Sequence, residues 1–318
     1  MEVLGGGGVW NIIIVRRVVM YMFLMVQYCS NGVLGLQFRA MYVFVDSLVD
    51  DGNNNFLDSI AKSNYYPYGC DFPIGPTGRF SNGKTFVDFL DPTTTGPRIV
   101  GGVNYASAAA GILDETGQHY GYRYSLSQQV INFENTLSQL RTMMSGTNLT
   151  QYLTTSLAVM VFGSDDYINY YLLPALYPST VTYTPSAFAN LLLNHYARQI
   201  QALYNVGLRK FFITGIGPLG CIPNQLAIGQ ALLGRCVDYV NQILGSFNEG
   251  LRSLVTIFNN GTTHPDAIFV YGNTYGIFGD ILNNPAAYVF FLSSNMEGMG
   301  TTITVLVGIG IRKKSIKG

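Results

Sequence analysis

The chain has 318 residues, of which 48% are hydrophobic and 11% are charged. It is long and apolar enough to bury a sizeable core and is neither disordered nor collagen-like. Eighteen basic and eighteen acidic residues balance, so no net field attracts nucleic acid or an anionic membrane surface. We therefore expect one compact domain, a monomer, whose partners are small molecules or neutral polymers and not nucleic acid.

Residues 1–36 have the features of a secretory signal peptide. The pair Arg16-Arg17 precedes the apolar run Val18–Tyr28, and small and polar residues follow. A membrane-spanning helix needs roughly 20 apolar residues, more than this run provides. The pattern favours a secreted, extracellular protein without stable membrane insertion, and an uncleaved anchor stays as the alternative.

Five short apolar segments are predicted as strands, and two longer segments carry apolar residues at helical spacing. The predicted helices are Ser127–Met144 and Ser186–Tyr204, the second ending at a Gly207 cap. Strands that alternate with helices predict an α/β fold with a parallel sheet of about five strands, covered on both faces. The predicted strands are Met41–Val45, Val103–Ala106, Leu157–Phe162, Phe211–Gly215 and Ala267–Tyr271.

Functional residues of such a sheet gather at the carboxyl ends of its strands. Ser47 follows the first predicted strand, the turn Ser107–Gly111 follows the second, and the turn Gly163–Asp166 follows the third. We expect these three segments to meet in space.

Three cysteines remain once the predicted signal is set aside. Cys221 and Cys236 flank a turn-rich loop, and a disulfide there would contribute roughly 3 kcal/mol by loop closure. Cys70 would then lie outside the pair. The alternative is that all three are small buried apolar side chains.

Several longer motifs carry a family resemblance. They are the segments FVDSLVDDGNNN at 44–55, GPTGRFSNGK at 75–84, GVNYAS at 102–107 and NNP at 283–285. In this order they resemble the plant GDSL esterase/lipase family of the SGNH hydrolase superfamily, over residues 41–290. The resemblance implies a three-layer α/β/α, flavodoxin-like fold in a domain at 37–290, followed by a divergent tail at 291–318. It also implies hydrolysis of carboxylic esters of lipids or acylated small molecules or glycans, without a cofactor.

The resemblance makes Ser47 the nucleophile that attacks the ester carbonyl, a weak group unless a base activates it. Outside this motif, a serine here would be interpreted as a helix cap. The family's second block corresponds to Asn104–Gly111 and its third block to Gly163–Tyr167. Gly111 is the candidate backbone donor to the oxyanion, with Ala109 as the alternative if its φ is negative, because alanines replace glycines of the second block. Asp165, in the third block, occupies the position of the oxyanion asparagine.

Two substitutions are expected to weaken the site. An ionised Asp165 accepts hydrogen bonds but donates none, and losing one oxyanion donor costs roughly 100- to 1000-fold in rate. Val45 replaces the glycine of the signature, which strains the backbone if the turn needs a positive φ.

The family's carboxyl-terminal Asp-x-x-His motif has no counterpart in the tail, which contains no histidine. His264 precedes the last predicted strand and is interpreted as a surface-loop histidine, and His119 and His195 as solvated or packed side chains. We therefore expect an esterase/lipase with impaired activity, or alternatively a catalytically silent secreted protein that keeps the ester-binding cleft. No cysteine, histidine or carboxylate spacing calls for a metal.

The signal-peptide prediction is tested by amino-terminal sequencing of the protein secreted by a plant host. The first residue is expected between about Gly32 and Ala40, after small residues that suit cleavage. A chain that retains Met1 in the cytosol would contradict it.

Overall fold

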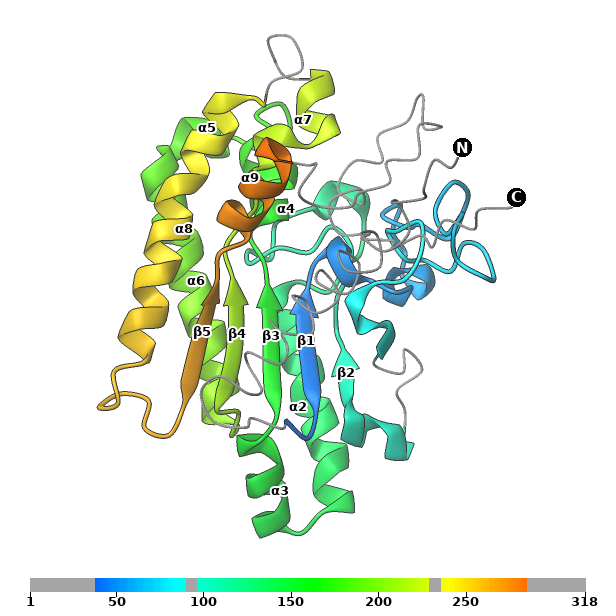
Figure 1. Ribbon diagram of the computed structural model, residues 1–318, viewed down its shortest axis with the longest axis vertical. Helices are drawn as coiled ribbons and strands as arrows, with labels where there is room; N and C mark the ends of the chain where they lie inside the picture. The colour runs from blue at the N-terminus through cyan, green and yellow to red at the C-terminus, as the bar shows by residue number, and fades with distance from the viewer. Residues whose placement is uncertain (1–37, 90–95, 229–235, 285–318) are drawn as a thin grey trace, which may run out of the picture.

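The computed structural model describes residues 38–89, 96–228 and 236–284 (Figure 1). The predicted signal peptide at 1–36 and the tail at 291–318 lie outside these residues. The five strands form one parallel sheet in the order β2-β1-β3-β4-β5. They are β1 (Met41–Val45), β2 (Gly102–Asn104), β3 (Leu157–Val161), β4 (Lys210–Thr214) and β5 (Ile268–Gly272).

Helices flank the sheet, which confirms the predicted α/β class. The described helices are α2 (Leu126–Met143), α3 (Gly146–Thr154), α4 (Ser164–Asp166), α5 (Ser179–Thr182), α6 (Pro185–Asn205), α7 (Pro223–Ile228), α8 (Asp238–Phe258) and α9 (Thr274–Asn283). Shorter 3-10 turns are η1 (Ser47–Val49), η2 (Asn53–Phe56), η3 (Phe86–Phe89), η4 (Gly96–Gly101), η5 (Gln118–Tyr120) and η7 (Leu219–Cys221), and η6 (Tyr167–Tyr171) is a π turn. Within the described ranges, no helix is long and apolar enough to cross a membrane.

The strands are apolar because the sheet buries both of its faces. Tyr42 and Phe44 of β1 point into the larger core, with side chains from α2, α6 and α8. Val43 and Val45 point to the opposite face and pack against a smaller cluster that includes Val49. A near-continuous apolar run is typical of a parallel strand buried on both sides.

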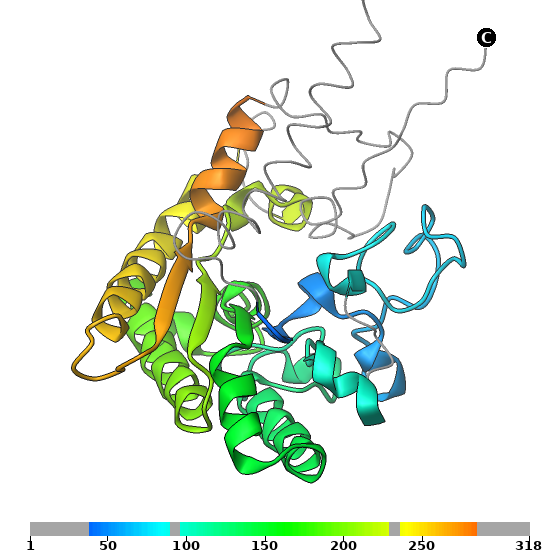
Figure 2. The ribbon, with the colours of Figure 1, turned by 60° about the horizontal axis from the view of Figure 1, so that its bottom comes forward.

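The helices on the larger face are held by their own apolar stripes. In Figure 1, α2 and α6 lie behind the sheet, and α8 packs against α6. In Figure 2 the blue-to-cyan β1–β2 connection lies apart from these green and yellow helices, on the side of the sheet that carries β1 and β2. Thr184 caps α6 by accepting the Ala187 N–H at 3.2 Å, and Gly207 follows the helix at φ 117°. The predicted Gly207 stop is confirmed.

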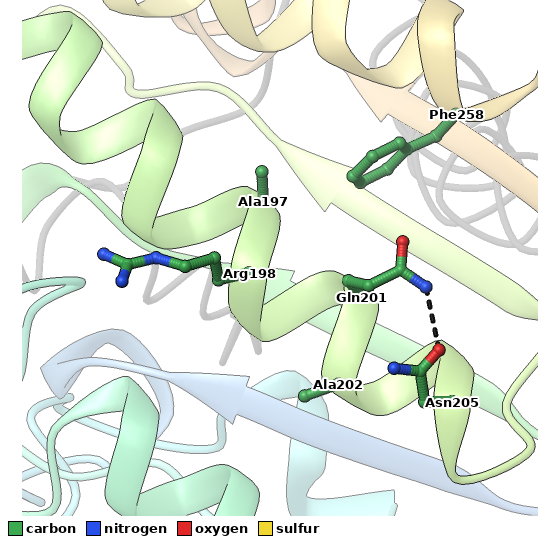
Figure 3. Close-up of a pocket in the computed structure, with 6 residues that line it drawn as sticks. All are labelled: Ala197, Arg198, Gln201, Ala202, Asn205 and Phe258. Atoms are coloured by element: carbon green, nitrogen blue, oxygen red, sulfur yellow. Dashed lines mark hydrogen bonds between the residues drawn. The ribbon is translucent and has the colours of Figure 1, made fainter. Parts of the chain in front are cut away.

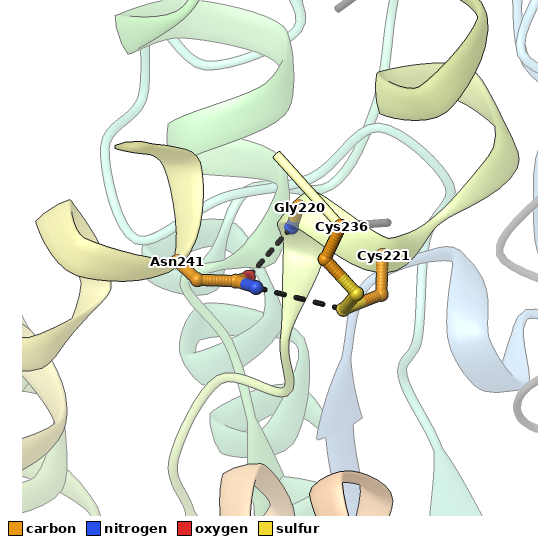
Figure 4. Close-up of a disulfide and its surroundings, with 4 residues drawn as sticks. All are labelled: Gly220, Cys221, Cys236 and Asn241. Atoms are coloured by element: carbon orange, nitrogen blue, oxygen red, sulfur yellow. Dashed lines mark hydrogen bonds between the residues drawn. A yellow bond between two sulfur atoms is a disulfide. The ribbon is translucent and has the colours of Figure 1, made fainter. Parts of the chain in front are cut away.

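Cys221 and Cys236 form the predicted disulfide, which joins η7 to the residues just before α8 (Figure 4). Asn241 of α8 supports it, because its side chain accepts the Gly220 N–H at 2.8 Å and its amide nitrogen lies 3.5 Å from Cys221 Sγ. Cys70 is exposed and lies outside this bond. The disulfide therefore ties the loop after β4 to the amino-terminal end of α8.

Replacing Cys221 and Cys236 together by serine is expected to lower the free energy of unfolding by roughly 3 kcal/mol, because the unfolded chain regains the entropy of a 15-residue loop. Urea unfolding of the non-reduced proteins measures this loss. Cys70→Ser is the matched control and should unfold like the unsubstituted chain. A double variant within about 0.5 kcal/mol of that chain would show that the bond does not stabilise the fold.

Candidate active site

The site lies where the chain reverses its direction of travel across the sheet. From β1 the chain goes to β2 on one side, and from β2 it crosses to β3 on the other side of β1. The carboxyl ends of β1 and β3 therefore form the switch point at which open α/β sheets bind their ligands. Val45 pairs with Val161 at this end, so the residues that follow the two strands start side by side.

Ser47 begins the turn η1 directly after β1 and is half-buried. Asp46 caps this turn, since its Oδ1 accepts the Leu48 N–H at 3.0 Å. Among the described residues, no side chain shares a hydrogen bond with Ser47 Oγ. The described structure therefore shows no group that accepts the proton of this hydroxyl at the switch point.

The condition for backbone strain at Val45 is not met. Val45 is the fully buried last residue of β1, and its φ lies outside the left-handed region. A β-branched side chain suits a buried strand position of this kind. The turn η1 begins only at Ser47, after Asp46.

Buried polar side chains tie the Ser47 turn to the second block. Asp50, which is fully buried, accepts the N–H groups of Gly52 and Ala108, both at 2.9 Å. Asn54 donates to the Ala108 carbonyl at 3.0 Å, and the Ser107 hydroxyl donates to Asn54 at 2.6 Å. Burial raises the pKa of Asp50 to about 6, and the backbone donors oppose that rise.

Asp166 joins the second block to the third. Its Oδ2 accepts the Ile112 N–H at 2.8 Å, and its Oδ1 accepts the Leu113 N–H at 3.0 Å and the Thr116 hydroxyl at 2.6 Å. Burial raises the pKa of Asp166 to about 6, and these donors hold it from rising further. The predicted meeting of the three segments is confirmed by these bonds and by the Ser107 N–H, which donates to the Val45 carbonyl at 3.1 Å.

Ala109 and Gly111 remain the candidate oxyanion donors of the second block. Neither N–H donates a hydrogen bond to an acceptor among the described residues. Alanine can replace glycine without strain where φ is negative, but Ala109 has a φ of 64°. The condition set for Ala109 is therefore not met. A Cβ at Gly111 would meet Asp166 Oδ1 and Thr116 Cβ at 2.5 Å, so glycine is required there for space.

Asp165 lies in the first turn of α4 and is 3% exposed. The expectation that it repels an oxyanion assumed an ionised carboxylate. Burial, followed by the charges of Asp46 and Asp166, raises the pKa of Asp165 well above its ordinary value. A raised pKa favours the neutral acid, which can donate a hydrogen bond, so the direction of this shift opposes the assumption of an ionised Asp165.

None of the three histidines forms a hydrogen bond with Ser47 in the described part of the chain. His264 is 5% exposed, and its Nε2 lies 2.7 Å from Gln201 Oε1. The interpretation of His264 as a surface-loop residue is therefore wrong. It precedes β5 and so lies at the amino-terminal edge of the sheet, roughly 13 Å along a five-residue strand from the edge that carries Ser47. His119 lies 3.0 Å from the Tyr177 hydroxyl, and His195 is half-buried on α6.

A narrow hollow of about 60 Å³ adjoins the Ser47 turn. Leu48, Ser164 and Phe278 line it together with apolar residues that follow β4. A larger hollow of about 340 Å³ lies between the last turns of α6 and Phe258 at the end of α8 (Figure 3). Because Gln201, which lines it, also binds His264, this second hollow is at the opposite edge of the sheet. We place the candidate site at the first.

Ala109→Gly is expected to be at least about 1 kcal/mol less destabilising than Ala108→Gly, because only the first change relieves a left-handed alanine. Both alanines are buried, so both changes remove one packed methyl group. The midpoints of urea unfolding provide the comparison. Equal losses in the two variants would contradict a strained backbone at Ala109.

Comparisons with known proteins agree with this geometry. The profile of the GDSL-like Lipase/Acylhydrolase family matches residues 42–288. "GDSL esterase/lipase At1g71250" of Arabidopsis thaliana is 61% identical over 264 residues, which cover 79% of this chain and 70% of that protein. "GDSL esterase/lipase At5g08460" and "GDSL esterase/lipase 7" of the same plant are 52% and 44% identical, over 80% of this chain and over 70% and 74% of their own lengths. The chain belongs to the plant GDSL esterase/lipase family of ester hydrolases.

Proposed function

We propose that this protein acts on carboxylic esters of lipids or of acylated small molecules or glycans, with Ser47 as the nucleophile. The observation that carries the proposal is the position of Ser47 at the β1/β3 switch point, half-buried in the first turn after β1. The hollow beside Leu48 adds an apolar wall that suits an acyl group. Its volume of about 60 Å³ favours a short acyl segment over a long chain at this point.

In this mechanism Ser47 Oγ forms a bond to the carbonyl carbon, and the alcohol leaves with the proton that the serine gives up. Water then hydrolyses the acyl-enzyme and returns the serine. The negative charge on the carbonyl oxygen needs donors that are in place before the reaction. The Gly111 N–H is our candidate for one, because it has no acceptor among the described residues.

We further propose that the 318-residue chain hydrolyses esters poorly. A serine hydroxyl is a weak nucleophile until a base takes its proton. The sequence has three histidines, and in the described structure each is engaged elsewhere or lies on another element. Loss of the histidine of a serine hydrolase costs on the order of 10⁶ in kcat.

The lack of a base beside Ser47 among the described residues also supports a second candidate function. In this alternative the chain is a secreted protein that binds an ester ligand without cleaving it. Buried bonds from Asp50, Asn54 and Asp166 hold the loops around the hollow independently of any base. Secretion is part of both proposals and is supported by the charged and apolar pattern of residues 1–36.

Ester hydrolysis by the purified chain is expected to exceed that of a Ser47→Ala control only slightly when p-nitrophenyl acetate is the substrate. The reason is that triad members act as a unit, so a serine without its base gains little from its position. Asp165→Asn alone should restore almost nothing. Appending the Asp-x-x-His segment of a relative after Phe290 should restore Ser47-dependent turnover. Rapid Ser47-dependent turnover by the unaltered chain would contradict the proposed impairment.

Binding without cleavage is tested on the same two proteins by isothermal titration with a short-chain ester. Equal affinity of the unaltered chain and of Ser47→Ala, with intact ester recovered, supports the binding function. Absence of binding at millimolar ester would exclude it.

A further inference from the structure

Two carboxyl groups beside the Ser47 turn each have one oxygen without a partner. Asp46 is 1% exposed and Asp165 is 3% exposed. One oxygen of each is engaged: Asp46 Oδ1 accepts the Leu48 N–H at 3.0 Å, and Asp165 Oδ1 accepts the Asn169 side-chain amide at 2.8 Å. The other oxygen of each, Oδ2, is buried and has no hydrogen-bond partner in the described part of the chain. An unpaired buried carboxylate oxygen is costly, so this arrangement needs an explanation.

The two carboxyl groups act on each other across the β1/β3 junction. Val45 and Val161 pair at the ends of these strands, so Asp46 and the loop that carries Asp165 leave the sheet from neighbouring positions. After burial, the charge of Asp46 is the largest cause that raises the pKa of Asp165. Burial also raises the pKa of Asp46, to about 7. Two like charges so placed disfavour the doubly ionised state.

The groups around the pair supply no positive charge. Asp166 of α4 raises the pKa of both carboxyls, and its own oxygens are taken by three donors. Tyr196 of α6 is buried with its hydroxyl unpartnered, and Tyr120 of η5 feels the charge of Asp165. Tyr167 faces Asp166 from the π turn. Among the described residues, no lysine or arginine is a cause of either raised pKa.

We propose that Asp46 and Asp165 share one proton, so that a neutral Asp165 donates an O–H···O hydrogen bond to Asp46 and holds the Ser47 turn against the third block. The proton comes from solvent and leaves one negative charge on the pair. A single bond of this kind satisfies both buried oxygens at once. Asp165 is thus a positioning residue, whose effect on Ser47 passes through Asp46.

An asparagine at residue 165 would donate an N–H to Asp46 at any pH, whereas the aspartate donates only while protonated. The aspartate that stands here in place of the family's asparagine therefore makes the contact depend on pH. Folding raises the pKa of these carboxyls, so the folded state keeps protons that the unfolded state loses. Stability from this source is full below the ordinary pKa of 3.8 and falls as the pH rises toward the raised pKa of Asp165 in the folded chain.

The first test is infrared difference spectroscopy of the full chain against Asp165→Asn at pH 8. A protonated carboxyl has a C=O stretching band that shifts in D₂O, and we expect this band to be lost in Asp165→Asn. In Asp46→Asn the band should remain but change its frequency, because Asp165 stays buried while the acceptor of its O–H is replaced. Asp58→Asn, at an exposed aspartate, is the control and should keep the band at its original frequency. A spectrum without the band in the unaltered chain, or a band with the same frequency in Asp46→Asn, would overturn the shared proton.

The second test needs no folded Asp46 variant. We expect Asp165→Asn and the unaltered chain to unfold at similar urea concentrations at pH 4. The equilibrium constant for unfolding of the unaltered chain should then rise relative to that of Asp165→Asn by up to about tenfold per pH unit toward pH 7. A gap that is constant between pH 4 and pH 8 would overturn the proposal. Neither test measures ester hydrolysis. A negative result would therefore contradict the shared proton without bearing on the proposed ester hydrolysis.

Discussion

The site depends on one buried carboxylate, that of Asp166. Three donors from the segment Ile112–Thr116 end on its two oxygens, and no other described contact ties the second block to the third so directly. Because hydrogen bonds to a charged acceptor are strong and an unsatisfied buried partner is costly, this carboxylate fixes the distance between the two loops. It also explains Gly111, where a Cβ would meet Asp166 Oδ1 at 2.5 Å.

The residues that differ from the family pattern are of another kind. Asp50, Asn54 and Asp166 hold the loops together, and all three keep their hydrogen bonds. The unusual residues, Ala109 and Asp165, lie where the resemblance expects groups that face the substrate. The fold can tolerate such changes, because the strand register and the hydrogen bonds of Asp50, Asn54 and Asp166 do not involve those two side chains. We infer that this chain preserves the architecture of an esterase more fully than its chemistry.

Much of the fold could be predicted from the sequence. Each of the five strands lies within a residue or two of its predicted place, because buried parallel strands are short apolar runs bounded by turns. No element was predicted over α8, although its buried side chains recur at helical spacing from Val240 to Phe258. Gly245 and Gly250 interrupt the pattern there, and at Gly250 a Cβ would meet Leu193 of α6 at 2.3 Å. Packing against α6 stabilises α8, and this packing cannot be recognised from the sequence of α8 alone.

The site was predictable as a meeting of loops but not in its electrostatics. Strand order brings Ser47 beside the third block, as expected from loops that follow the carboxyl ends of parallel strands. The φ of Val45, the burial of His264 and the raised pKa of Asp165 arise from tertiary contacts, which the sequence does not display. The interpretation of His264 as a surface residue was wrong for this reason. An aspartate in a sequence is taken as charged by default, and burial beside Asp46 favours its neutral form.

The central proposal is that Ser47 is presented at the β1/β3 switch point but has no base beside it among the described residues. The most direct measurement is the rate at which a fluorophosphonate modifies Ser47, followed by peptide mass spectrometry, with "GDSL esterase/lipase 7" treated in parallel. We predict that Ser47 reacts within about tenfold of the rate of Ser253, an exposed serine on α8 with no catalytic neighbour. The nucleophile of the relative should react far faster. Rapid and selective modification of Ser47, at the rate of the relative, would contradict the account.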